Sequence, residues 1–125
     1  LVWHLTRIQD DHVAGLDGLE QVWTSGGWAE RFALPLDMSD TGYGHDPVTV
    51  ATVVAEAPLL LDYYDAVHQK TLAFVRSLTD ADLARVVDRS WDPPVTTSIR
   101  LVSVLVDDLQ HVGQAAYARG ILQRR

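Results

Sequence analysis

Apolar residues recur at helical spacing in three long stretches of the chain, and these stretches predict its main helices. The first stretch opens the chain, where Leu1, Leu5 and Ile8 fall on one face of a helix. We expect this helix to end around residues 15–18 or to continue to about residue 23, because the segment 24–27 (Thr-Ser-Gly-Gly) is a clear break.

The second and third long helices are predicted near residues 58–77 and 97–122. In the second, residues at alternating steps of three and four form a seam that is typical of a packed bundle. The members of this seam are Tyr64, Val67, Thr71, Phe74 and Leu78. The third helix has a main apolar stripe formed by Val102, Leu105, Leu109, Val112 and Ala116. Three long helical segments predict an all-α helix bundle.

Shorter signals occupy the segments between these helices. Asp46-Pro47 is a helix start signal and predicts a short helix over residues 47–55. Residues 79–82 resemble a capping box with aspartate in place of glutamate. The segment 37–45 is a long loop of the kind that often carries function, and residues 95–97 are briefly strand-like.

Length, charge and composition restrict the classes of function. The 125 residues, 1–125, are expected to form one domain with a core of its own. A net charge of −7 with scattered basic residues disfavours nucleic-acid binding, and no apolar run approaches the roughly 20 residues of a membrane span. The absence of cysteine excludes disulfides, thiolate metal ligands and a cysteine nucleophile, and it fits a reducing cytoplasm.

A pair of polar residues in the last predicted helix points to metal chemistry. Asp107 and His111 are four residues apart, so a helix projects both from one face and a divalent cation can bind them together. Two ligands make a weak site, and His4 in the first predicted helix is the best third ligand. Asp108 is an alternative to Asp107, although the four-residue spacing aligns the side chains better.

The competing interpretation is an ordinary solvated helix face, and the spacing by itself favours it because a motif match is only a hypothesis. Two features favour the metal site. The last helix is apolar around much of its circumference, which is typical of a central helix whose polar groups face a cleft. His4 also lies on a polar strip with Arg7 and Asp11, so strips from two facing helices can line one cleft.

The other histidines and the tryptophans have simpler expectations. His45 lies in the glycine-containing loop and is either an exposed residue or a substrate contact and proton carrier. His12 is expected at the surface, and His68 in a partly buried structural position. The tryptophans are expected in the core or in a cleft wall because of their large apolar area; they are Trp3, Trp23, Trp28 and Trp91.

Four segments together resemble the DinB-like metal-binding four-helix bundles, and in particular an actinobacterial branch of this family. Residues 1–5 (Leu-Val-Trp-His-Leu) resemble the histidine motif of the family's second helix. Asp107-x-x-x-His111, followed by Val-Gly-Gln, resembles its last-helix motif, and residues 26–32 and 41–45 also match that branch. The resemblance implies an up-down-down-up four-helix bundle with these histidine and aspartate residues as metal ligands.

The sequence departs from the family pattern in two ways. Asp107 stands where many members have histidine, although the related mycothiol-dependent maleylpyruvate isomerases use a carboxylate there. A carboxylate ligand fits zinc or nickel, the metals we expect first, and also manganese or iron. The family's first helix would precede residue 1, so we expect an uncovered apolar seam that upstream residues or a partner subunit fills.

The resemblance also implies a function for the metal centre. The ion would bind a low-molecular-weight thiol such as mycothiol, as in the related mycothiol and bacillithiol S-transferases. The thiolate would attack an electrophilic substrate in an S-transfer or an isomerisation. Arg7, Arg100 and Arg119 are candidates for holding carboxylates of either reactant.

Loop and aromatic residues complete the expected site, with Tyr43, His45 and Trp28 forming the substrate wall. Two alternative functions stay open: a metal-dependent hydrolase, and a non-catalytic metal-binding stress-response protein that works as a structural dimer. In each case we expect a cytoplasmic homodimer that binds neither membranes nor nucleic acid.

Overall fold

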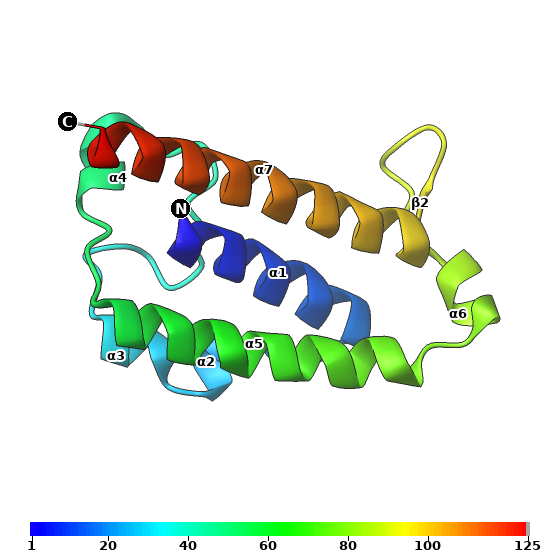
Figure 1. Cartoon of the computed structure of the whole chain (residues 1–125). Helices are drawn as coiled ribbons and strands as arrows, with labels where there is room; N and C mark the ends of the chain where they lie inside the picture. Colours follow the sequence, from blue (N-terminus) through cyan, green and yellow to red (C-terminus); the bar gives the residue numbers. More distant parts are fainter. Residues whose placement is uncertain (125) are drawn as a thin grey trace.

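Three long helices dominate the computed structural model, which describes residues 1–124: α1 (Val2–Asp17), α5 (Ala57–Ser77) and α7 (Thr97–Gln123). Helix α1 lies between the other two and packs against both (Figure 1). It runs parallel to α5 and antiparallel to α7. The start of the chain therefore lies beside the middle of its last helix, and the all-α prediction is confirmed.

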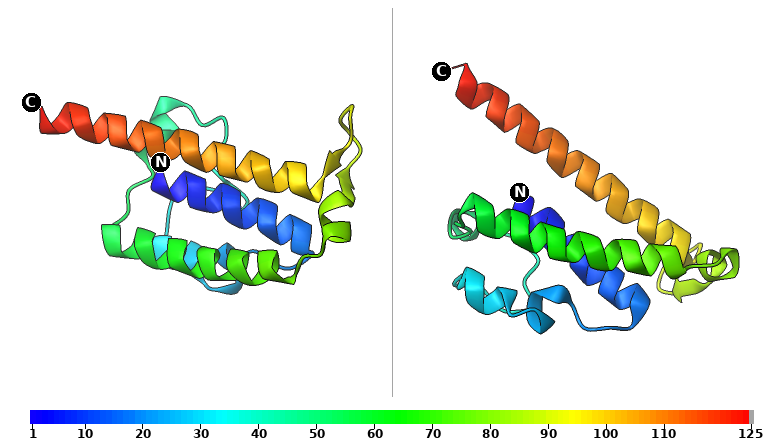
Figure 2. Two further views of the ribbon diagram at one scale, coloured as in Figure 1. Left: turned by 45° about the vertical axis from the view of Figure 1, so that its right-hand side comes forward. Right: turned by 60° about the horizontal axis from the view of Figure 1, so that its bottom comes forward.

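Four short helices and a hairpin fill the connections. The crossover from α1 to α5 contains α2 (Val22–Ser25), α3 (Trp28–Phe32) and α4 (Pro47–Ala51). Helices α2 and α3 cover the side of α5 and α1 that faces away from α7 (Figure 2). After α6 (Asp80–Ala84), the strands β1 (Val86–Asp88) and β2 (Val95–Thr96) pair antiparallel and lead directly into α7. The expected strand at residues 95–97 is thus confirmed for its first two residues.

The helix ends follow local signals in the sequence. Gly18 adopts a left-handed conformation with φ of 70° and ends α1, which decides between the two ends we expected. The Asp46 carboxylate accepts a hydrogen bond from the Thr49 amide at 2.7 Å and begins α4, although this helix stops at residue 51 instead of 55. The capping box at Thr79 and Asp82 is confirmed and begins α6.

The core consists of an aromatic cluster and a smaller aliphatic one. The aromatic cluster joins α1, α2, α3 and α5 through Trp3, Trp23, Trp28, Phe32, Tyr63 and Val67. The second cluster brings Val13 and Leu16 of α1 against Phe74 of α5. The expectation for the tryptophans is therefore confirmed for three of them. Trp91 is the exception, because it lies in the hairpin loop with 66% of its surface exposed.

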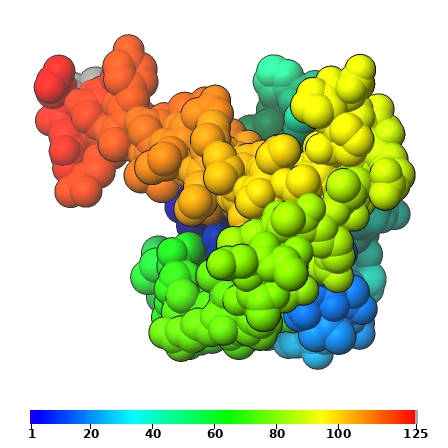
Figure 3. Space-filling model, turned by 90° about the vertical axis from the view of Figure 1, so that its right-hand side faces the viewer, coloured from blue at the N-terminus to red at the C-terminus, as the bar shows by residue number. Residues whose placement is uncertain are grey.

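The main apolar stripe of α7 does not pack against the rest of residues 1–124. Leu109 is 71% exposed, and Val102, Leu105 and Val112 are exposed as well. The C-terminal half of α7, orange to red in Figure 3, extends beyond the other helices. An apolar seam is uncovered as expected, while the polar strip of the same helix faces α1. Within residues 1–124, every helix is too short or too polar to cross a membrane.

Candidate metal centre

Three side chains from opposite ends of the chain converge between α1 and α7. One ligand atom from each of His4, Asp107 and His111 lies within 4.8 Å of the other two. The Nε2 atom of His111 is 3.6 Å from Oδ1 of Asp107, and the rings of His4 and His111 meet edge to face with centroids 4.6 Å apart. Two ligand atoms of tetrahedral zinc are about 3.4 Å apart, so small side-chain rotations bring all three donors within reach of one ion.

Hydrogen bonds to the two imidazoles leave the same nitrogen of each ring free. Nδ1 of His4 lies 2.6 Å from the carbonyl oxygen of Thr41, which can only accept, so Nδ1 carries the hydrogen. Nδ1 of His111 donates in the same way to the side-chain oxygen of Gln114 at 2.8 Å. Each Nε2 therefore presents a lone pair to the centre, which is the arrangement that outer partners give to metal-ligating histidines.

Asp107 supplies the negative charge of the centre. Its Oδ2 atom is buried and has no hydrogen-bond partner within residues 1–124. A buried carboxylate oxygen without a partner is costly, and a divalent cation beside it would remove that cost. Two imidazole nitrogens and one carboxylate are a donor set that suits zinc, nickel, manganese and iron. The residues present thus fit a divalent ion.

Asp108 does not belong to this cluster. Its Oδ1 atom is also buried, and it has no hydrogen-bond partner among residues 1–124. Burial, and after it the charge of Asp107, raises the pKa of Asp108 to about 6. Of the two aspartates considered as ligands, only Asp107 approaches the histidines.

A cavity of about 530 Å³ opens beside the three side chains, and we refer to it as the metal-side cavity. His4, Asp107 and His111 line one part of it, and the loop from Gly42 to His45 lines another. Gln110 and four apolar residues complete the lining; the apolar residues are Leu1, Trp3, Val50 and Val53. Tyr43 is 87% exposed at this cavity. A small molecule that enters it has access to the metal ligands and to the loop.

Gly42 allows this loop to approach α1 closely. It has a φ of +90°, and a Cβ atom there would lie 2.9 Å from Nδ1 of His4 and 3.0 Å from Cζ3 of Trp3. Both the backbone conformation and the contact distances therefore require glycine. The close approach is also what brings the Thr41 carbonyl within hydrogen-bond distance of His4.

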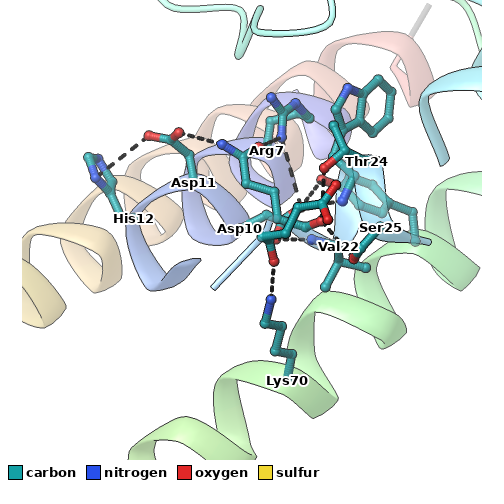
Figure 4. A network of polar contacts seen from close by, with 12 residues as sticks. Arg7, Asp10, Asp11, His12, Val22, Thr24, Ser25 and Lys70 are labelled. Carbon is teal, nitrogen blue, oxygen red and sulfur yellow. Dashed lines mark hydrogen bonds and ion pairs between the residues drawn. The ribbon is translucent and has the colours of Figure 1, made fainter. Parts of the chain in front are cut away.

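Arg7 holds the same loop from inside the protein. The side chain is fully buried, and its Nε donates to the carbonyl oxygen of Asp40 at 3.0 Å. One of its terminal nitrogens donates to Gln21 at 2.6 Å and lies 3.8 Å from Asp10 (Figure 4). Arg7 does not line the metal-side cavity, so the structure does not bring it to a reactant as we expected. Its contacts position the loop.

The other expected site residues also lie elsewhere. Arg100 forms an ion pair with Asp88 at 3.1 Å in a separate cavity. Arg119 lies on the exposed surface of α7, two turns beyond His111, and Trp28 is part of the aromatic core. The structure brings together His4, Tyr43, His45, Asp107 and His111, and it leaves these three residues outside.

The sequence interpretation missed the groups that orient the histidines. Gln114 carries a signal that was available, because residues three apart on a helix are neighbours. Thr41 carries none, because it acts through a backbone carbonyl that any residue possesses. Asp40 pairs with His45 across a loop whose conformation no periodic pattern describes.

The fold and this site define a helical bundle with a candidate metal centre built from two histidines and one aspartate. The chain belongs to the mycothiol-S-transferase family, a DinB-like family whose model matches residues 11–123. The match confirms the family resemblance and includes Asp107 and His111, but it begins after His4.

A solved structure of a conserved protein from Enterococcus faecalis is similar to the chain, with 38% sequence identity and a TM-score of 0.88. The similarity covers 94% of this chain and 70% of that one. No curated protein matches.

Proposed function

We propose that the protein is a divalent-metal-dependent enzyme that transfers the sulfur of a low-molecular-weight thiol, of the mycothiol type, to an electrophilic substrate. The observation that carries this proposal is the convergence of His4, Asp107 and His111 at the wall of an open cavity of about 530 Å³. Three protein ligands leave coordination positions open, which is the pattern of catalytic sites. Membership of the mycothiol-S-transferase family supports a thiol as one reactant.

A bound divalent ion, zinc or nickel first and manganese or iron as alternatives, supplies positive charge that favours the thiolate over the thiol. His4 and His111 would hold the ion through Nε2, and Asp107 through its carboxylate. Thr41 and Gln114 keep the two rings in the ligating orientation. Holding these rings in place before the ion arrives reduces the conformational freedom lost on binding.

The rest of the cavity is suited to the electrophile. The apolar side chains of Leu1, Trp3, Val50 and Val53 give the cavity an apolar wall. Tyr43 and His45 present polar groups from the loop. A substrate with an apolar body and one electrophilic carbon fits this division. We propose a cytoplasmic location, because low-molecular-weight thiols are kept reduced there.

The test combines metal analysis with turnover. Purified protein should contain a stoichiometric divalent metal, lose it to a chelator, and regain turnover of mycothiol with chlorodinitrobenzene when the metal returns. Asp107→Asn should lower metal content and turnover together, whereas the matched variant Asp88→Asn should lower neither, because Asp88 pairs with Arg100 outside the centre. Protein that holds metal but turns over no thiol with any electrophile contradicts the transferase proposal.

One observation favours a second candidate function, a non-catalytic metal-binding homodimer. The exposed apolar face of α7 around Leu109 and Val112 is a surface that a second copy can cover. Sedimentation of wild type and Leu109→Glu tests it. A dimer that dissociates in the variant supports assembly through α7, and a monomer in both proteins excludes it.

A further inference from the structure

His45 lines the metal-side cavity, apart from the three candidate ligands, and it belongs to a second acid–histidine pair with Asp40. Nε2 of His45 lies 3.2 Å from Oδ1 of Asp40. The His45 side chain is only 10% exposed, against 37% for Asp40. A carboxylate accepts, so Nε2 carries the hydrogen and Nδ1 carries the lone pair. Within residues 1–124, Nδ1 of His45 forms no hydrogen bond.

The Asp40 carboxylate is held in place by its own loop and by α1. The Oδ2 atom of Asp40 accepts a hydrogen bond from the backbone amide of Asp37 at 3.2 Å. The backbone amide of Asp40 donates to the backbone carbonyl of Asp37 at 3.0 Å. The backbone carbonyl of Asp40 accepts a hydrogen bond from the buried Arg7 guanidinium at 3.0 Å. The His45 ring is therefore paired with a carboxylate that has little freedom to move away.

The other polar groups at this cavity are unsuited to accept a proton from a thiol. His4 and His111 have their Nδ1 atoms committed to Thr41 and Gln114, and their Nε2 atoms face the metal centre. Asp107 belongs to the same centre. Tyr43 is a phenol and Gln110 is an amide, and these neutral groups are weak bases. His45 is the imidazole of this cavity whose lone pair is free.

We propose that His45 accepts the proton of the substrate thiol, with Asp40 as the positioning residue that fixes the ring and stabilises its charged form. This inference rests on the proposed function. The S–H bond breaks, its proton moves to Nδ1 of His45, and the electron pair stays on sulfur. The sulfur forms a bond to the electrophilic carbon while the leaving group departs with its own bonding pair. The imidazolium then gives the proton to the leaving group or to the buffer.

The decisive measurement counts protons when thiol binds, with no electrophile present. Zinc-loaded proteins of equal metal content are titrated with mycothiol near neutral pH, by calorimetry in two buffers that differ in ionisation enthalpy. In wild type, His45 should retain the thiol proton that it accepts, so His45→Gln should release more protons per bound thiol than wild type. His12→Gln, which changes a histidine of the separate Arg100 cavity, should match wild type.

Turnover then separates the two residues. His45→Gln should lower kcat by about 10²–10⁴-fold. Asp40→Asn should lower kcat less than His45→Gln and leave KM unchanged, because the ring loses its carboxylate partner while the cavity keeps its lining. If a variant lost activity because it unfolded, circular dichroism would show the loss of helix and the zinc content would fall as well.

The outcomes distinguish the inference from the function beneath it. Equal proton release by wild type and His45→Gln, with thiol bound to both, overturns the role of His45 and leaves the transferase proposal standing. Failure of every zinc-loaded protein to bind thiol overturns both.

Discussion

The interface between α1 and α7 contains two clusters of histidine and aspartate. The first is the candidate metal centre of His4, Asp107 and His111. The second lies two turns further along α1, where a cavity of about 310 Å³, the Arg100 cavity, is lined by Asp11, His12, Gly15, Leu16, Val87, Asp88 and Arg100. The two clusters share residue types and helices, yet only the first places three ligand atoms together.

The positively charged side chain of Arg100 at the second cluster accounts for much of this difference. Arg100 binds Asp88 at 3.1 Å. Hydrogen bonds from Ser90, and after them the charge of Arg100, lower the pKa of Asp88. Burial, and after it Arg100, lowers the pKa of His12. At the first cluster, Asp107 has no arginine or lysine partner within residues 1–124.

The comparison separates the candidate metal centre from an ordinary Asp–His cluster by two features. At the candidate centre the carboxylate lacks a cationic partner within residues 1–124, and each imidazole has its second nitrogen bound to an acceptor. The Arg100 cluster lacks the first feature. It also contributes one histidine, whose nearest acid is 4.0 Å away.

The largest expected effect comes from removing the ligand that joins the two helices. His4→Ala should weaken zinc binding by more than about 100-fold, beyond the 10–100-fold typical of outer partners, because one of three ligands is lost. Calorimetric titration with zinc measures it. His12→Ala is the matched control at the Arg100 cavity and should keep wild-type affinity; equal losses in both would show that the first cluster is not the binding site.

A smaller effect is expected from the glycine that presses the loop against His4. In Gly42→Ala the new Cβ would meet His4 and Trp3, so zinc affinity should fall by about 10-fold and stability by about 1–3 kcal/mol. Gly44→Ala provides the control, because Gly44 also has a positive φ, +72°, but nothing lies within 4 Å of its Cβ position. It should lose stability and retain zinc affinity in the same titration.

The partly buried carboxyl group of Asp108, next to the candidate ligand Asp107, should make the stability of the protein depend on pH. The pKa of Asp108 is raised to about 6, so the folded metal-free protein binds this proton more tightly than the unfolded chain. Its stability therefore falls as pH rises from about 4 through 6. Asp108→Asn removes that loss and should be more stable by about 1 kcal/mol at pH near 8, after allowance for solvent screening.

Urea denaturation of metal-free wild type and Asp108→Asn at both pH values measures this difference. The two proteins should be about equally stable near pH 3, below the unfolded aspartate pKa of about 3.9, where the carboxyl is mostly protonated in both states. An advantage of the variant that is the same at both pH values would point to packing instead of charge.

The smallest effect is expected at the Arg100 cavity. Arg100→Gln removes the second cause that lowers the pKa of His12, so this pKa should rise. Because the His12 pKa lies below its unfolded value, its contribution to stability is lost as pH falls through about 6.5, and the variant should lose less. NMR titration of the histidine ring measures the shift; an unchanged pKa would mean that burial alone sets it.

Much of the fold could be predicted from local patterns. The seam of α5, the start of α4 at Asp46 and the capping box at Thr79 depend on residues only a few positions apart. The pairing of Asp107 with His111 is of the same kind, because one helical turn joins them. The exposed stripe of α7 was also visible as an apolar pattern, but whether it is covered depends on what packs against it.

The sequence by itself therefore determined the three long helices, the starts of α4 and α6, and the face of α7 that carries Asp107 and His111, because these depend on spacing along the chain. The tertiary structure alone decided that His4 reaches this pair, that Arg7 is buried under the loop, and that Arg100 neutralises Asp88. Such contacts join residues more than ten positions apart, and their geometry depends on how α1 packs between its neighbours. Two carbonyl oxygens from one loop, those of Asp40 and Thr41, complete that arrangement.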